Sequence, residues 1–389
     1  MAKLIDITGK ALSGEWGTDD ETGDGIPVLR TTNFTNEGVV DYNNVVTRTI
    51  TKKNIDEKFL RKGDIIIEKS GGSDKFPVGR VIYFDGDENT YLFNNFTGLL
   101  RVKDKKAWYP RYIFYSLFAN YRRGGTRAFE NKTTGLHNLK TDDYVSRYEV
   151  AEVDVSEQIS ICDKLDKLYG IIKSREQELQ LLDELIKARF VEMFGDPVAN
   201  SNGLIKKTLP ELGEFGRGVS KHRPRNDEVL LGGPYPLIQT GDVANSGLYI
   251  TEYHSTYSEL GLQQSKMWDE GTLCITIAAN IAKTAILGFD ACFPDSIVGF
   301  NANEETNNVF VNYWFSFFQE ILESQAPESA QKNINLKILS ELKVIVPNIQ
   351  EQNEFVDFVA RVNKTKVAVR KALDDTKLLF DSLMQKYFG

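Results

Sequence analysis

The chain has 389 residues, of which 41% are hydrophobic and 26% are charged, and its formal net charge at pH 7 is -8. This length allows two domains that each bury a core, and the composition is that of a soluble globular protein. We expect no membrane span, since no apolar run approaches the roughly 18 residues required, and no signal peptide at Met1–Asp6. Cys162, Cys274 and Cys292 are scattered, which argues against a disulfide framework or a zinc site and fits a reducing cytoplasm.

The first part of the chain alternates short apolar runs with Gly, Asn and Asp, which predicts β-strands. These runs are Val39–Val46, Ile65–Ile67, Val78–Phe84 and Leu99–Val102. Tyr112–Tyr121 has helical spacing instead. We expect its aromatic side chains to belong to the core rather than to stack on bases: Tyr112, Phe114, Tyr115 and Phe118.

Positive charge gathers between Arg101 and Lys140, where ten lysines and arginines accompany only two acids. Within it, Arg122-Arg123-Gly124-Gly125 reads as a loop, from which guanidinium groups can reach a phosphate or a guanine edge. A solvated basic face is the alternative explanation. The acidic segment Glu15–Asp24 cannot lie against phosphate, so this edge of the domain should face away from nucleic acid.

A long amphipathic helix is predicted over Glu157–Gly195. Its apolar residues are spaced by three, four or seven, which is the heptad pattern of a helix that packs along another helix: Leu165, Leu168, Ile172, Leu179, Leu182, Ile186 and Met193. Arg175 and Arg189 interrupt this seam. Gly195 followed by Pro197 ends the helix.

Asn200–Gly203 reads as a linker, after which the pattern of the first part returns. Thr272–Ala278 and Thr284–Phe289 are predicted strands, and Val311–Leu322 is a predicted helix whose aromatic residues we assign to the core: Tyr313, Trp314, Phe317 and Phe318. Lys206–Arg225 holds six lysines and arginines against two acids. Two basic clusters, one in each part, favour nucleic acid over a merely solvated face.

The end of the chain repeats the long helix at an offset of 194 residues and without a gap. Glu157-Gln158 corresponds to Glu351-Gln352, and Phe194-Gly195 to Phe388-Gly389. The apolar seam of this second helix is Val359, Val362, Val369, Leu373, Phe380 and Leu383. The two seams are interrupted at different places, as expected if the helices bury against each other; two unrelated amphipathic helices are the alternative.

Shorter matches in the same order extend the repeat to the globular parts: Ile26–Thr31 with Tyr235–Thr240, Lys62–Ile67 with Glu270–Ile275, and Asn138–Lys140 with Asn335–Lys337. We therefore predict an α+β protein with a pseudo-two-fold internal repeat, in which each mixed domain is followed by one long helix. The expected segments are a first domain at 1–153, a helix at 154–196, a second domain at 197–348 and a helix at 349–389.

Motifs for catalysis are nearly absent. The chain lacks the Pro-Pro pair of an amino-methyltransferase motif and the Gly-x4-Gly-Lys loop of an ATP-driven motor, and Gly216-Arg217-Gly218 lacks the third glycine of a dinucleotide loop. The three histidines are too few and too scattered for a metal centre. Asp41 upstream of Asp56-Glu57-Lys58 resembles the metal-binding pattern of many nucleases, but that pattern is short and common by chance.

These features together resemble the specificity (S) subunit of type I restriction–modification enzymes, over the whole chain. The resemblance rests on the two-fold plan of domain plus helix, the Lys62–Ile67 strand, the segment from Gly71-Gly72-Ser73 to Val78-Gly79-Arg80, and the repeated Asn-Leu-Lys and Glu-Gln pairs. It implies that each domain is a target recognition domain that reads one part of a split site in double-stranded DNA.

The resemblance also implies that the helices form an antiparallel coiled coil. This pair would set the distance between the domains and dock two methyltransferase (modification) subunits, which restriction subunits join later. The chain itself would be non-catalytic and bind no cofactor, and S-adenosylmethionine, ATP and magnesium would belong to the partner subunits.

Candidate DNA-binding residues follow from chemistry, because such domains differ by target: Arg suits guanine, Asn suits adenine, and Lys suits phosphate. For the first domain they are Lys69, Ser70, Arg122, Arg123, Arg127, Lys132 and His137. For the second domain they are Lys221, His222, Arg223, Arg225, Asn280, Lys283 and Lys332.

Two other functions stay open from the sequence. One is an interaction scaffold that binds proteins through the helices and binds no DNA. The other is a stand-alone metal-dependent nuclease that uses Asp41 and Asp56. Neighbouring reading frames for a methyltransferase and a motor nuclease would favour the recognition subunit over both.

Overall fold

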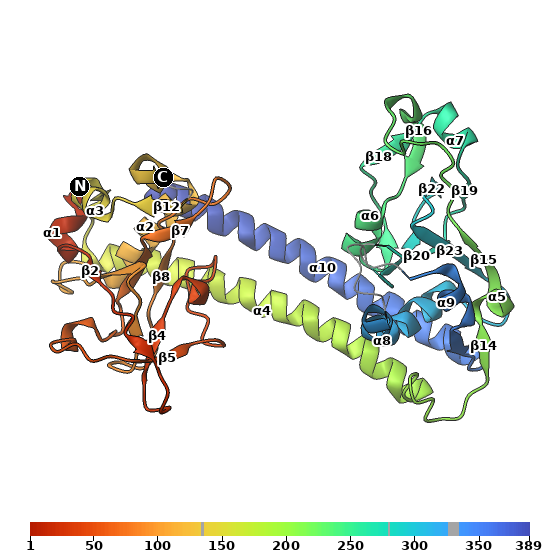
Figure 1. Ribbon diagram of the computed structural model, residues 1–389, viewed down its shortest axis with the longest axis horizontal. Coiled ribbons are helices and arrows are strands. Elements are labelled where there is room, and N and C mark those ends of the chain that lie inside the picture. Colours follow the sequence, from red (N-terminus) through yellow and green to blue (C-terminus); the bar gives the residue numbers. More distant parts are fainter. Residues whose placement is uncertain (134–135, 279–280, 326–333) are drawn as a thin grey trace. The chain divides into compact units, whose positions relative to one another are not determined.

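The computed structural model describes residues 1–133, 136–278, 281–325 and 334–389 (Figure 1). The chain forms two compact units, one of Met1–Glu176 with Lys371–Gly389 and one of Gln177–Arg370. Each unit contains a globular domain and part of each of two long helices, α4 (Val155–Phe194) and α10 (Ile349–Phe388). None of the described helices combines the length and the apolar character that crossing a bilayer requires.

The domain of the first unit is built from small sheets whose strand orders are β2-β10-β6-β8, β3-β5-β4-β9 and β11-β12-β7. Its first and last strands, β1 and β13, pair antiparallel and bring the ends of the domain together. The strands are β1 (Ala2–Lys3), β2 (Leu12–Ser13), β3 (Thr18–Asp19), β4 (Ile26–Leu29), β5 (Val46–Thr49), β6 (Ile65–Glu68), β7 (Ser70–Gly72), β8 (Val81–Tyr83), β9 (Leu92–Phe93), β10 (Thr97–Leu100), β11 (Glu130–Thr133), β12 (Leu136–Leu139) and β13 (Glu149–Val150). The helices are α1 (Leu4–Thr8), α2 (Pro110–Arg122) and α3 (Thr141–Arg147).

The domain of the second unit repeats this topology. Its sheets run β15-β23-β20-β21-β17 and β18-β16-β22-β19, and β14 pairs with β24, as β1 does with β13. The strands are β14 (Lys206–Thr208), β15 (Gly213–Arg217), β16 (Leu231–Leu237), β17 (Tyr249–Ile250), β18 (Ser255–Tyr257), β19 (Met267–Trp268), β20 (Leu273–Thr276), β21 (Thr284–Leu287), β22 (Ala291–Cys292), β23 (Ile297–Ala302) and β24 (Lys343–Ile345). The helices are α5 (Leu209–Leu212), α6 (Thr240–Asn245), α7 (Glu259–Gln263), α8 (Asn308–Gln325) and α9 (Leu336–Glu341).

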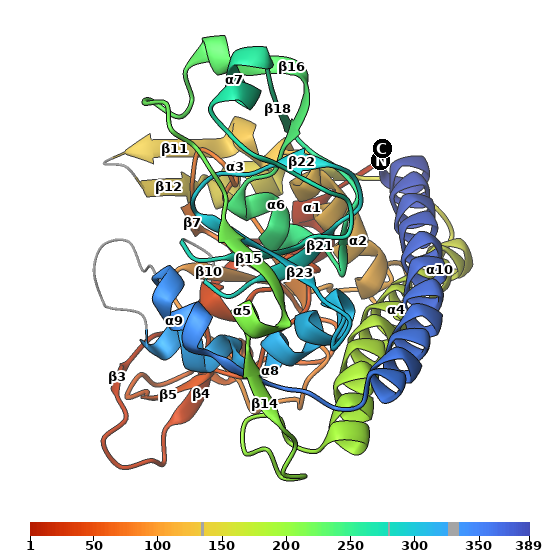
Figure 2. The same ribbon diagram turned by 90° about the vertical axis from the view of Figure 1, so that its right-hand side faces the viewer.

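The strand order makes the internal repeat visible in three dimensions. β15, β23, β20 and β21 take the places that β2, β10, β6 and β8 have in the first domain. In each domain a parallel pair joins the second sheet, β4 with β9 and β16 with β22. The two domains are seen from another side in Figure 2. The predicted α+β fold with a tandem repeat is confirmed.

Most predicted strands are confirmed with shifts of a few residues, but Val39–Val46 is wrong. Only Val46 belongs to a strand, and Val40 forms an isolated bridge with Phe34. The Asp41 carboxylate accepts a hydrogen bond from the Asn43 N–H at 2.9 Å. Such a turn, in which an Asp side chain bonds the backbone two residues on, competes with strand formation.

The two long helices pack together and run antiparallel. In the second unit Asp183 pairs with Lys366 at 2.5 Å and Phe190 lies 5.3 Å from Phe355, so residue numbers rise on α4 as they fall on α10. The predicted seam residues are all buried or partly buried. Those that are buried are Leu165, Ile172, Ile186, Val359, Val362, Val369, Leu373 and Phe380, and those that are partly buried are Leu168, Leu179, Leu182, Met193 and Leu383.

A buried glutamine fastens each long helix to its own domain. Gln158, 1% exposed, donates to the carbonyls of Ala107 and Val153 and accepts from the Tyr109 N–H. Gln352, its equivalent at the offset of 194, donates to the carbonyls of Glu305 and Pro347 and accepts from the Thr306 hydroxyl. The repeated Glu-Gln pair of the sequence is therefore a structural clamp at the start of each helix.

Replacing Gln158 with alanine is expected to lower the free energy of unfolding by about 3 kcal/mol, because three part-buried hydrogen bonds to backbone groups are lost. Urea denaturation followed by circular dichroism measures this change. Gln180→Ala is the matched control, since Gln180 is exposed and bonds only the Glu184 carboxylate. Its expected cost is below about 0.5 kcal/mol. Equal costs for the two variants would contradict the clamp.

Candidate nucleic-acid interface

The first domain gathers candidate residues around the sheet β11-β12-β7. Asn138 of β12 lies opposite Ser70 of β7, and His137 lies opposite Gly72. Lys69 precedes β7 and donates to the Ser13 hydroxyl at 3.0 Å. Burial lowers the pKa of Lys69. Lys69, Ser70 and Asn138 border a cavity of about 500 Å³. The residues that line it are Ala11, Ser13, Lys69, Ser70, Asn95, Phe96, Asn138, Leu139, Thr141 and Asp142.

The segment that follows β7, from Ser73 to Phe76, exposes further side chains to solvent. The Arg127 guanidinium donates to the carbonyls of Asp74 and Lys75 at 3.4 Å. Phe76 is 56% exposed, and the Lys75 ammonium lies 5.3 Å from its ring centroid. An exposed phenyl ring beside cationic side chains is a surface on which a base or a deoxyribose can pack.

His137, a predicted DNA-binding residue, is buried beside two carboxylates. It is 6% exposed, and its Nδ1 lies 3.2 Å from a carboxylate oxygen of Glu130. Its Nε2 lies 3.6 Å from the Asp74 carboxylate, across the turn that carries Phe76. A ring held in this way positions the turn, while little of its own edge is left for a DNA base.

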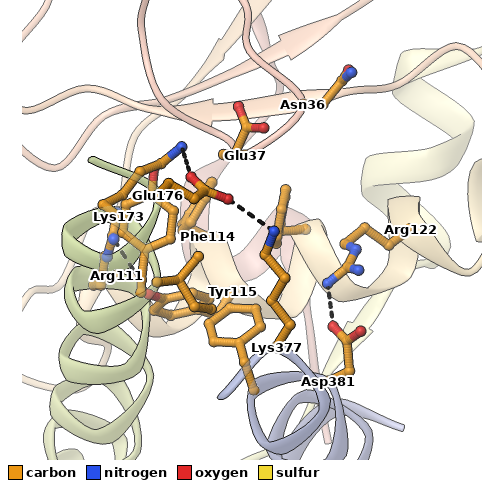
Figure 3. Close-up of a pocket in the computed structure, with 14 residues that line it drawn as sticks. Asn36, Glu37, Arg111, Phe114, Tyr115, Arg122, Lys173, Glu176, Lys377 and Asp381 are labelled. Atoms are coloured by element: carbon orange, nitrogen blue, oxygen red, sulfur yellow. Dashed lines mark hydrogen bonds and ion pairs between the residues drawn. The ribbon is translucent and has the colours of Figure 1, made fainter. Parts of the chain in front are cut away.

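Arg122 and Arg123 are not brought together with that surface. Arg122 forms an ion pair with Asp381 of α10 at 2.8 Å, and Arg123 is exposed at the end of α2. Figure 3 shows Arg122 facing Asp381, while Lys173 and Lys377 reach the Glu176 carboxylate. The hydrogen bond from Lys377 lowers the pKa of Glu176. These residues surround a cavity of about 360 Å³, whose lining includes the aromatic rings of Phe114, Tyr115, Phe118 and Phe380.

In the second domain the candidate residues occupy the loop that follows β15. Lys221, Arg223 and Arg225 are exposed. Asp227 accepts a hydrogen bond from the His222 ring at 3.0 Å, and this bond lowers the pKa of Asp227. The guanidinium groups of Arg223 and Arg225 both approach the carboxylate of Asp295.

The remaining candidates of the second domain are described in part. Lys283 is partly buried, and its backbone bonds Thr276 of β20 through both its N–H and its carbonyl. Asn280 and Lys332 lie outside the described residues. In the first domain the backbone of Lys132 belongs to β11, opposite His137.

Two acids of the acidic segment of the first domain pair with cations from the strand and loop beside it. Asp19 pairs with Arg48, whose guanidinium lies 4.2 Å from the centroid of Trp16. Glu15 pairs with Lys52 and Lys58. Lys58, one of the residues of the nuclease-like pattern, is thereby engaged with Glu15. Among the described residues no group of three or more His, Cys, Asp or Glu side chains is placed to hold a metal ion.

Sequence reasoning missed the amide and aromatic groups of these surfaces. Asn95 and Phe96 form a turn between two buried strands, and Phe96 is 54% exposed. Asn138 belongs to the repeated Asn-Leu-Lys motif, so the internal repeat could have identified Asn138 as a candidate residue. Asp295 and Phe76 carry no comparable pattern in the sequence.

Comparison with known proteins identifies the family to which the chain is related. A family model, the type I restriction modification DNA specificity domain, matches residues 2–183 and 206–375. A putative type I restriction enzyme MjaX specificity subunit from Methanocaldococcus jannaschii is 19% identical over 337 residues, which cover 83% of this chain and 78% of the relative.

Solved structures agree in fold. The crystal structure of the S subunit of a type I restriction–modification system from M. genitalium has a TM-score of 0.58 at 17% identity, over 100% of this chain and 95% of that one. A chain from a study of complex assembly and conformational transition of the type I R-M system has a TM-score of 0.58 at 16% identity, over 100% and 96%. The chain therefore belongs to the family of type I restriction modification DNA specificity domains, the non-catalytic recognition components of these systems.

Proposed function

We propose that this chain is the DNA sequence-recognition subunit of a cytoplasmic type I restriction–modification complex and reads a bipartite target with one half-site per domain. The observation that carries the proposal is the duplication of one topology with different exposed groups. The first domain exposes Arg127 and keeps Lys69 partly buried, whereas the second exposes Lys221, Arg223 and Arg225. Two related domains with unlike surfaces suit two unlike half-sites.

Methylation-site mapping tests this proposal. The chain is produced together with the modification subunit encoded beside it, and the DNA of the producing cells is sequenced by a method that detects methylated bases. We expect one asymmetric bipartite sequence to be methylated, and the isolated chain to leave DNA unmodified. A complex that assembles but has no sequence preference would favour the protein-interaction scaffold instead. Magnesium-dependent cleavage by the isolated chain, lost in Asp41→Ala, would favour the nuclease.

The partners in this proposal are two modification subunits, with restriction subunits joining the assembled complex. These partners would use S-adenosylmethionine, ATP and magnesium, whereas this chain would bind none of them. Each unit has a cavity beside the helix that follows its own domain, one of about 360 Å³ in the first unit and one of about 480 Å³ in the second. Their helix residues are related by the offset of 194, since Tyr169, Ile172, Lys173 and Glu176 correspond to Asn363, Lys366, Val367 and Arg370.

Two cavities beside equivalent helix positions support two copies of one partner, each docked on one unit. Lys173 and Val367 occupy the same position in the repeat and are solvent-exposed. Lys173→Glu or Val367→Glu should each weaken the binding of one modification subunit by about 10²-fold, because an unpaired carboxylate is buried in the contact. Native mass spectrometry would then count one modification subunit per chain, and none for the double variant.

Val229→Glu is the control for this docking experiment. Val229 is 58% exposed and lines neither cavity, so its variant should keep both modification subunits. A double variant of Lys173 and Val367 that still holds two subunits would show that the partner docks elsewhere.

A further inference from the structure

Two arginines of the second domain converge on a single carboxylate. Asp295 lies between β22 and β23, and its side chain is 29% exposed. A terminal nitrogen (Nη2) of Arg225 contacts its Oδ1, and Nη2 of Arg223 lies 3.6 Å from its Oδ2. The other terminal nitrogen (Nη1) of Arg223 donates to the carbonyls of Ser220 and His222 at 2.7 and 2.8 Å.

The loop that carries these arginines is fixed against the loop that carries the acid. The Gly218 N–H donates to the Ile297 carbonyl at 2.9 Å. A Cβ at Gly218 would lie 2.4 Å from the carbonyl oxygens of Phe293 and Pro294, so only glycine allows this approach. Phe293 is fully buried and stacks on Trp268 at 5.1 Å. The Asp295 carboxylate thus projects from a rigid part of the domain.

The arginines remain open on their other side. The side chains of Arg223 and Arg225 are 55% and 46% exposed, so the donors that face neither Asp295 nor the carbonyls of Ser220 and His222 can meet a ligand. Guanine is recognised by two parallel N–H bonds from one guanidinium plane, which demands a fixed orientation. A carboxylate that pairs with the guanidinium groups restricts their orientation before DNA arrives and reduces the entropy lost on binding.

The same carboxylate is unfavourable for simple attraction to phosphate. An acid between two arginines cancels part of their charge, and affinity for any DNA sequence depends on the positive charge that meets the backbone. A surface made only to hold phosphate would gain by losing this acid. Its presence therefore favours base reading over backbone binding at these two arginines.

We infer that Asp295 is a specificity-determining positioning residue, which holds Arg223 and Arg225 to read guanine edges in the half-site of the second domain. The inference rests on the proposed function and adds that the base read is guanine and that Arg223 and Arg225 read it. Asp295 acts through the arginines and does not touch the base itself.

The test uses the assembled complex and short duplexes that carry the mapped target. Dissociation constants are measured by fluorescence anisotropy for the target and for duplexes with each guanine of the second half-site replaced in turn. Asp295→Asn keeps the shape and removes the charge. The ratio of target to replaced-site affinity at the guanines read by these arginines should fall by roughly tenfold, while affinity for unrelated DNA should rise. Discrimination in the first half-site should be unchanged.

Asp290→Asn is the matched control. It removes the same unit of charge from the same domain, at a carboxylate that accepts a bond from the Glu270 N–H at 2.8 Å. Arg223→Lys and Arg225→Lys should lose discrimination at the same base pairs as Asp295→Asn, because lysine reaches phosphate but has no bidentate fork. When either lysine variant is combined with Asp295→Asn, the loss of discrimination should be smaller than the sum of the two single losses.

The outcomes separate the inference from the proposed function. A wild-type complex without sequence preference would overturn the proposed function. A wild-type preference that survives in Asp295→Asn at the level of Asp290→Asn would overturn only the role of Asp295. Should Asp295→Asn melt at a lower temperature than wild type, the lysine variants still decide, since discrimination unchanged in both of them contradicts guanine reading by these arginines.

Discussion

Exchanging residues 1–153 for the matching segment of another specificity subunit should change one half of the methylated target and leave the other half as it was. The antiparallel pairing of β1 with β13 brings the ends of the first domain together, so the exchange removes one closed domain. Each mismatched base pair costs roughly 1–3 kcal/mol, so a half-site with three changed pairs should lose at least about 10²-fold in affinity.

The structure sets one condition on the donor domain. α2 packs on the end of α10, where Tyr112 lies 5.1 Å from Phe388 and Arg122 pairs with Asp381. A donor that keeps these residues, or receives them by substitution, preserves that contact. Methylation mapping of the exchanged complex decides: two changed half-sites, or two unchanged ones, would contradict one reader per domain.

The repeat and the long helices were predictable because they depend on periodicity. The seam spacing and the offset of 194 appear in the sequence without knowledge of any tertiary contact. Arg189, which interrupts the seam, is partly buried, and its guanidinium lies 5.8 Å from the Phe358 ring and pairs with Glu192. Its aliphatic stem fills the seam while the charge stays near water.

The seam pattern did not identify Phe190, although this residue is fully buried. A heptad describes a helix with one partner, but the end of α4 is covered by the second domain as well as by α10. Phe190 meets several rings at once, with centroid distances of 5.2 Å to Phe310, 5.2 Å to Phe317 and 5.3 Å to Phe355. The predicted core aromatics Tyr112, Phe114, Tyr115, Phe118 and Trp314 are confirmed as buried.

The candidate site was less predictable, because local charge does not show where a partner lies in the fold. Arg122 and Arg123 are neighbours in a basic stretch, yet Arg122 pairs with an acid 259 residues away. The acid that meets Arg223 and Arg225 lies in a distant loop for the same reason. Composition located the basic clusters, and tertiary pairing determined which members remain available to a ligand.

Lengthening both long helices together should lengthen the unread spacer of the DNA target. Four residues inserted between Glu176 and Gln177 of α4, and four between Arg370 and Lys371 of α10, add about 6 Å to each helix at 1.5 Å per residue. DNA rises about 3.4 Å per base pair along one strand, so the spacer should grow by one or two base pairs. The flanking half-sites should stay the same, because neither domain is altered.

The insertion points follow from the division of the chain into two units, which falls between these residues. The Glu176–Lys377 pair then stays within the first unit and the Asp183–Lys366 pair within the second. Insertion into α4 alone would shift one seam against the other, and we expect it to abolish methylation. Seven residues in each helix keep the heptad phase better than four and should add about three base pairs.

Four residues inserted into the turn Asn200–Gly203 serve as the control, since this turn lies outside both helices and should leave the spacer unchanged. Long-read mapping of methylated sites measures the spacer in every variant. A complex that methylates DNA with both helices lengthened and the spacer unaltered would show that helix length does not set the distance between half-sites. A graded increase for four and seven residues, absent for the turn insertion, would assign that distance to α4 and α10.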